Sequence, residues 1–194
     1  MEQQKLLDLL KDMSLDEKIN QLFQGGAGFY AEGSIATGPA SEQGFSEKTI
    51  REAGSVLSVV GAKTIKEIQK NHMENHPHHI PLVFMADIIN GYKTIFPIPL
   101  AQGAAFNPKV AYTGAEVAAK ESSAAGIHVT FSPMVDLVRD ARWGRVMEST
   151  GEDPYLNSVY AKALVEGYQG DDPKKPGKLG ACVKHFAGYG APTG

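Results

Sequence analysis

Short apolar runs that alternate with amphipathic segments constrain the fold of this chain more than any other feature. The runs cover residues 55–60, 81–86, 127–131 and 179–183, and a helical pattern follows each of the first three. Strands that read as continuous apolar runs and alternate with helices are typical of a parallel sheet covered by helices. We therefore predict an α/β fold, either a doubly wound sheet or a (β/α)8 barrel.

The extent of the strand pattern favours part of a barrel. No G-x-G-x-x-G motif follows the early strands, which argues against a dinucleotide-binding sheet. A whole barrel typically needs about 250 residues, whereas this chain has 194. We expect the N-terminal portion of a (β/α)8 TIM-like barrel, incomplete in this chain, as one partial domain over residues 1–194; the alternative is a small open sheet. An uncovered edge strand would then allow self-association.

Capping residues predict where the helices begin. A Ser or Thr followed three residues later by Glu occurs at Ser14 and Thr64, and an Asn or Asp before Pro occurs at Asn107 and Asp153. Residues 25–44 are rich in glycine and predict a loop. The helix that follows Ser14 is expected to bury three apolar side chains, Ile19, Leu22 and Phe23.

Composition and charge exclude several classes of protein. The net charge is −3 and the cationic residues form no stripe, which argues against a nucleic-acid partner. No segment approaches the roughly 20 apolar residues of a membrane span, and the N-terminal leucines alternate with charges, unlike a secretion signal. The single cysteine, Cys182, excludes an internal disulfide framework and is expected in the core. We expect a cytoplasmic protein without a membrane partner or a cofactor.

Polar side chains follow three of the predicted strands. Asp87 follows the run 81–86, and Lys184 and His185 follow the run 179–183. Ligands of parallel α/β folds bind at the carboxyl ends of the strands, and a carboxylate facing cationic donors suits a polyhydroxylated ligand. The run 127–131 is followed by Asp136, Arg139, Asp140, Arg142 and Arg145, some of which should pair with one another or with Glu148, Glu152 and Asp153.

Three ordered motifs strengthen this interpretation. They are Asp87-Ile-Ile-Asn-Gly within residues 87–100, Arg142-Trp-Gly-Arg145 within residues 131–154, and Lys184-His-Phe-Ala-Gly-Tyr-Gly190. In order and spacing they resemble glycoside hydrolase family 3, closest in style to its bacterial β-glucosidases, and the resemblance extends from Met13 onward. It implies hydrolysis of terminal, non-reducing β-D-glucosyl residues, with an oligosaccharide or β-glucoside as the small-molecule partner. It also implies a retaining mechanism with an aspartate nucleophile and a glutamate acid/base.

The resemblance carries substrate-binding roles to Asp87, Arg145, Lys184 and His185. Asp87 would accept hydrogen bonds from two adjacent sugar hydroxyls and the other three would donate, while Arg142 would brace its loop. Asn90 stands where the family usually has His, and we expect it to support the loop.

No catalytic or metal-binding residue can be assigned. The family's nucleophile lies in a Ser-Asp-Trp stretch downstream of the Lys-His motif, whereas the only tryptophan, Trp143, follows Arg142. We therefore expect the isolated chain to bind sugar weakly and to hydrolyse nothing at a useful rate.

Other interpretations remain open. The chain could be a non-catalytic carbohydrate- or partner-binding module, or Lys184 could form a Schiff base as in barrel aldolases. His72 and His76 are spaced as in helical zinc sites, but no Glu follows His72 and Pro77 ends the helix, so a metal site is disfavoured.

Overall fold

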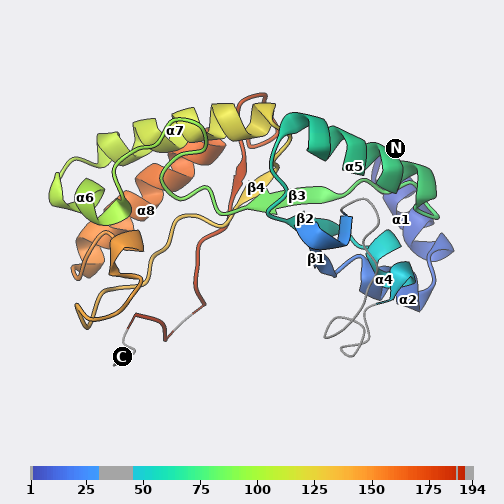
Figure 1. Ribbon diagram of the computed structural model, residues 1–194, viewed down its shortest axis with the longest axis horizontal. Coiled ribbons are helices and arrows are strands. Elements are labelled where there is room, and N and C mark those ends of the chain that lie inside the picture. Colours follow the sequence, from blue (N-terminus) through green and yellow to red (C-terminus); the bar gives the residue numbers. More distant parts are fainter. Residues whose placement is uncertain (1, 31–45, 187, 191–194) are drawn as a thin grey trace. The chain divides into compact units, whose positions relative to one another are not determined.

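The computed structural model describes residues 2–30, 46–186 and 188–190. The chain divides into two compact units, Met1–Met85 and Ala86–Gly194. Each unit combines parallel strands with helices (Figure 1). The predicted loop over residues 25–44 lies mostly outside the described residues.

The first unit is built on three short strands that pair in parallel and in sequence order. They are β1 (Gln24–Gly26), β2 (Ser55–Leu57) and β3 (Val83–Ala86), whose last residue begins the second unit. Val56 and Phe84 are almost fully buried, as is Ile65 of the following helix. The helices are α1 (Glu2–Asp12), α2 (Leu15–Asn20), α4 (Glu47–Arg51) and α5 (Ala62–Asn75), with the 3-10 helix η1 (Ala27–Tyr30).

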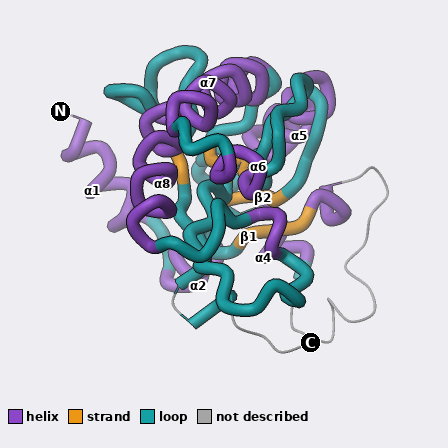
Figure 2. Tube along the Cα trace, turned by 90° about the vertical axis from the view of Figure 1, so that its left-hand side faces the viewer, coloured by secondary structure: helices purple, strands orange, loops and turns teal. Residues whose placement is uncertain are grey.

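The second unit holds strands β4 (Val129–Thr130) and β5 (Gly180–Ala181), which also pair in parallel. Within this unit the Phe131 N–H donates to the Ala86 carbonyl at 3.1 Å. Its helices are α6 (Pro99–Ala104), α7 (Pro108–Ala124) and α8 (Pro154–Gln169), with the 3-10 helix η2 (Val146–Glu148). Helices α7 and α8 pack against each other (Figure 2), and Tyr160 and Tyr168 of α8 are almost fully buried.

Most predicted helix starts are confirmed. Ser14 and Glu17 form the expected capping box, and the side chains of Asn107 and Asp153 cap α7 and α8. The start predicted at Thr64 is wrong, because α5 begins at Ala62 after Gly61, whose φ of 91° turns the chain into the helix earlier.

Three predictions about local environment are wrong. β1 extends into the start of the predicted glycine-rich loop, because backbone pairing with β2 needs no apolar pattern. Ile19 of α2 and Leu22, just past the end of that helix, are 56% and 87% exposed, and the helix makes polar contacts instead, including Asn20 Nδ2 to Glu52 Oε2 at 2.8 Å. Cys182 is exposed rather than in the core. It lies just past β5, which pairs only with β4 among the strands that the structure describes.

The alternation of parallel strands and helices is the predicted one. Over the described ranges, no helix is both long and apolar enough to cross a membrane. Whether the uncovered edge of β5 supports self-association stays a prediction, as does the single domain over residues 1–194.

Candidate functional site

The second unit brings Asp87 and Lys184 together at the carboxyl ends of β3 and β5. Asp87 directly follows β3, and Lys184 lies three residues beyond β5. The Lys184 ammonium donates to Asp87 Oδ1 at 2.6 Å. The Asp87 side chain is 47% exposed and that of Lys184 only 12%, so the carboxylate faces solvent more openly. These two strand-end residues therefore converge as the parallel arrangement requires.

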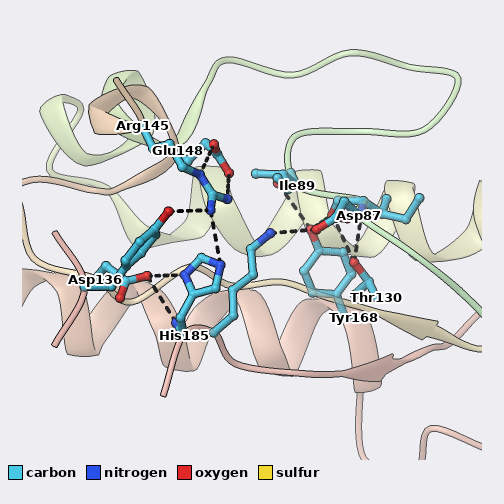
Figure 3. A network of polar contacts seen from close by, with 11 residues as sticks. Asp87, Ile89, Thr130, Asp136, Arg145, Glu148, Tyr168 and His185 are labelled. Carbon is cyan, nitrogen blue, oxygen red and sulfur yellow. Dashed lines mark hydrogen bonds and ion pairs between the residues drawn. The ribbon is translucent and has the colours of Figure 1, made fainter. Parts of the chain in front are cut away.

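The segment that carries Asp87 is fixed by buried neighbours (Figure 3). The Ile88 N–H donates to Thr130 Oγ1 of β4 at 3.0 Å. The Tyr168 hydroxyl of α8 donates to the carbonyls of Ile88 at 2.5 Å and Ile89 at 3.3 Å. Burial raises the pKa of Tyr168 to about 12, so this hydroxyl keeps its proton at neutral pH. Asp87 is thus held in place before any ligand arrives.

Arg145 is oriented by Glu148, three residues further along the loop and η2. The Arg145 Nε and Nη2 donate to the two Glu148 carboxylate oxygens, each at 2.7 Å. This bidentate contact raises the pKa of Arg145 and lowers that of Glu148. The remaining Nη1 lies 3.2 Å from His185 Nε2. Arg142 instead pairs with Asp140 and its side chain is 75% exposed, so Arg145 is the one of the two arginines that contacts His185.

Asp136 holds His185 from the other side (Figure 3). Its Oδ2 lies 2.8 Å from His185 Nδ1 and accepts the His185 backbone N–H at 3.1 Å. The Asp136 side chain is 4% exposed, whereas that of His185 is 33% exposed. Tyr189 packs its ring edge-on against His185, with centroids 4.6 Å apart, and against Trp143 at 5.2 Å. The peptide bond between Lys184 and His185 is cis.

The cluster therefore consists of three acid–base pairs, which are Asp87–Lys184, Glu148–Arg145 and Asp136–His185. The four residues predicted to bind sugar each belong to one of them. The sequence pointed to Asp136 as a strand-end residue and to Glu148 as an ion-pair partner, but it assigned neither to the site. Tyr189 was missed, although it lies within the third motif.

The chemistry of this arrangement suits binding of hydroxyl groups. Carboxylates only accept hydrogen bonds and Lys and Arg only donate them, so a sugar hydroxyl can bridge the two kinds. Glu148 stays ionised because Arg145 lowers its pKa, which makes it unsuitable as a general acid. The site as described can hold and orient a polyhydroxylated ligand.

Asn90 supports the loop after Asp87, as its position suggested. Its side-chain amide donates to the Phe96 carbonyl at 3.1 Å, and the Phe96 N–H donates to the Asn90 carbonyl at 2.8 Å. Asn90 thereby closes the loop over residues 91–95.

His76, one of the two histidines with the spacing of a helical zinc site, is already engaged by backbone groups. His76 Nδ1 already accepts the N–H groups of His78 and Ile80, at 3.1 and 3.4 Å. Within the part of the chain that the structure describes, no group of three or more His, Cys, Asp or Glu side chains could hold a metal ion.

The fold and the site together define the class of protein. Parallel strands alternate with helices, and paired carboxylates and cations lie at the carboxyl ends of the strands, where the active sites of barrel enzymes lie. The chain belongs to glycoside hydrolase family 3, because the model of the glycosyl hydrolase family 3 N-terminal domain matches residues 14–194.

Relatives of known structure and name agree with this assignment. The chain is 36% identical over 189 residues to a periplasmic β-glucosidase of Salmonella typhimurium, covering 96% of this chain and 23% of that protein. A putative β-xylosidase of Formosa agariphila is 35% identical over 199 residues, covering 96% and 26%. The crystal structure of a Listeria innocua β-glucosidase superposes with a TM-score of 0.91 at 50% identity, covering 98% of this chain and 27% of that chain.

These matches confirm the fold class. The chain has the N-terminal portion of a TIM-like barrel, and it spans about a quarter of the length of these relatives.

Proposed function

We propose that this chain binds the terminal, non-reducing β-D-glucosyl unit of an oligosaccharide or β-glucoside for a retaining family 3 hydrolase. The observation that carries the proposal is the convergence of Asp87–Lys184 with Arg145–His185 at the strand ends. Similar proteins support it, since the Listeria innocua β-glucosidase has been solved in complex with glucose, at 50% identity and a TM-score of 0.90. A mutant of that enzyme has also been solved with laminaribiose.

The contacts indicate how each residue would serve this role. The Asp87 side chain is 47% exposed and contacts Lys184 through Oδ1, so its carboxylate has lone pairs left for two adjacent hydroxyls. Lys184 carries three donor hydrogens and directs one of them to Asp87. A hydroxyl placed beside both would therefore donate to the carboxylate and accept from the ammonium.

The bond-breaking groups would lie outside this cluster. A retaining hydrolase needs a nucleophilic carboxylate and a second carboxyl group whose pKa is raised so that it can act as the acid. Asp87, Asp136 and Glu148 each contact a basic side chain instead. We therefore expect no turnover by the 194-residue chain on its own.

The Schiff-base alternative gains no support from the geometry. Lys184 Nζ lies 2.6 Å from Asp87 Oδ1 and is engaged in that contact, whereas a Schiff base needs a free amine nucleophile. The binding-module alternative differs from our proposal in one respect only. In our proposal, a longer protein would add the nucleophile and the acid, whereas a binding module has neither.

Titration of the purified chain with glucose, followed by backbone amide NMR shifts, tests the binding role. Arg145→Met and Asp87→Asn should each weaken glucose binding about tenfold or more, the cost of about 1.5 to 3 kcal/mol for a charged hydrogen bond. Arg142→Met is the matched control, because Arg142 pairs with Asp140 away from His185. No glucose binding, or equal loss in both arginine variants, would overturn the proposal.

An aryl β-glucoside tests the catalytic part separately. We expect no release of the aryl group above background. Turnover at a rate typical of enzymes would show that the chain holds its own nucleophile and acid.

A further inference from the structure

The two ring nitrogens of His185 face partners of opposite hydrogen-bonding character. His185 Nδ1 lies 2.8 Å from the Asp136 carboxylate, and Nε2 lies 3.2 Å from Arg145 Nη1. An ionised carboxylate can only accept, so Nδ1 must carry a proton. A guanidinium can only donate, so Nε2 must present its lone pair. Both contacts are satisfied together only by the neutral ring with its proton on Nδ1.

Supporting contacts fix each partner in this orientation. Asp136 is held on His185 by a second hydrogen bond, because the same Oδ2 accepts the backbone N–H of His185 at 3.1 Å. Its side chain is 4% exposed, which keeps it away from ligand and solvent. The Arg145 Nε and Nη2 each donate to a Glu148 carboxylate oxygen at 2.7 Å, which leaves Nη1 directed at His185. The ring is therefore clamped between a buried acceptor and an oriented donor.

From this geometry we infer that Asp136 is a positioning residue, which holds His185 as the Nδ1–H tautomer and makes Nε2 an acceptor toward the ligand. A sugar hydroxyl that enters between His185 and Arg145 would then donate to Nε2 and accept from Nη1. This last step rests on the proposed sugar-binding function. In this hydrogen bond His185 accepts from the sugar, whereas the resemblance led us to expect that His185 donates to it. The tautomer of His185 thus determines the direction in which the hydrogen of that sugar hydroxyl must point.

The tautomer can be measured in the chain without any ligand. Long-range 1H–15N correlation spectra of the labelled protein at pH 7.5 distinguish protonated from unprotonated ring nitrogens, and the His185→Gln variant assigns the signals. We expect a protonated Nδ1 and an unprotonated Nε2 in the wild type. A protonated Nε2 in the wild type would overturn the inference whatever the variants show.

Two substitutions separate positioning from packing. In Asp136→Asn, one carbonyl oxygen can still accept from both His185 groups that now share Oδ2, so the tautomer should be retained. In Asp136→Ala, the acceptor is gone, and the Nδ1 signal should shift toward the unprotonated position. An unchanged ring signal in Asp136→Ala would refute the role of Asp136.

Glucose titration of the same variants adds a separate readout. Asp136→Ala should bind glucose about tenfold or more weakly than the wild type, and Asp136→Asn should recover part of that loss. If the tautomer behaves as inferred but the wild type binds no glucose, the proposed function fails and the positioning role of Asp136 stands. If glucose binds but Nε2 is protonated, the proposed sugar-binding function stands and the positioning role of Asp136 fails.

Discussion

A buried histidine on α5 should make the first compact unit less stable in acid. His72 is 5% exposed, and its Nε2 is buried with no hydrogen-bond partner among the described residues. Burial, followed by the charge of His76, lowers its pKa from 6.5 to about 4. In the unfolded chain the same side chain would titrate near 6.5. The folded state therefore holds His72 in its neutral form.

The sign and size of the effect follow from proton linkage. Between pH 6.5 and about pH 4 the unfolded state binds more protons than the folded state, so stability falls as the pH falls through this window. Because of His72, the free energy of unfolding should be about 2 kcal/mol lower at pH 5 than at pH 7. Glu17 acts in a separate window, because the Ser14 backbone N–H lowers its pKa from 4.5 to about 2. Its stabilisation is kept down to about pH 4.5 and lost below it.

Amide hydrogen exchange of α5 measures this loss locally. Exchange of peptides from residues 62–75 is compared at pH 7 and pH 5, each normalised to an unfolded peptide of the same sequence, with α7 as the internal reference. The wild-type protein should lose protection of α5 on going from pH 7 to pH 5. His72→Gln removes the titrating group, so the free energy lost in this variant should be smaller by about 2 kcal/mol.

The matched control is His79→Asn. His79 is exposed and has a φ of 52°, which Asn tolerates. This control should keep the pH dependence of the wild type. If His72→Gln also kept it, burial of His72 would not be the cause.

Two further predictions concern the second unit and can be checked by urea unfolding. A Cβ at Gly167 would lie 2.6 Å from the Tyr112 carbonyl oxygen and 2.7 Å from Ala115 Cβ, so Gly167→Ala should destabilise the α7–α8 contact by about 1 to 3 kcal/mol. Gly144→Ala, whose Cβ meets nothing within 4 Å, should stay within about 0.5 kcal/mol. Tyr160→Phe removes a hydroxyl that donates to the Gln102 carbonyl at 2.6 Å and accepts the Asn107 N–H at 2.9 Å. It should cost about 1 to 3 kcal/mol, and an equal loss in the exposed Tyr155→Phe would contradict this reasoning.

Sequence reasoning succeeded where a local rule determines the structure. Helix starts at Ser14, Asn107 and Asp153 follow from side chains that cap amides within three residues of themselves. The approach of Asp87 to Lys184 was predictable for a different reason. Parallel strands place their carboxyl ends at one edge, so residues that follow them converge even at a separation of 97 positions.

It failed where the outcome depends on how loops fold back on each other. The contact of Asp136 with His185 requires the loops after β4 and β5 to run together, which the Val135 N–H bond to the Lys184 carbonyl at 2.8 Å and the Arg139 N–H bond to the Gly190 carbonyl at 3.1 Å provide. Backbone contacts between loops leave no periodic pattern in the amino-acid sequence. Likewise, helical spacing predicted a buried face that includes Ile19 and Leu22, but α2 ends at Asn20 and both side chains are exposed.

The charge balance of the site bears on the kind of ligand it can accept. The two cations Lys184 and Arg145 pair with the carboxylates Asp87 and Glu148, and a third carboxylate, Asp136, lies against His185. Each cation is already compensated within 2.7 Å, so an anionic ligand would gain little attraction and would face an excess of negative charge. A neutral sugar meets no such repulsion and can use the donors and acceptors that these pairs hold in place. We therefore expect the site to prefer an uncharged, polyhydroxylated ligand over a phosphorylated or acidic sugar.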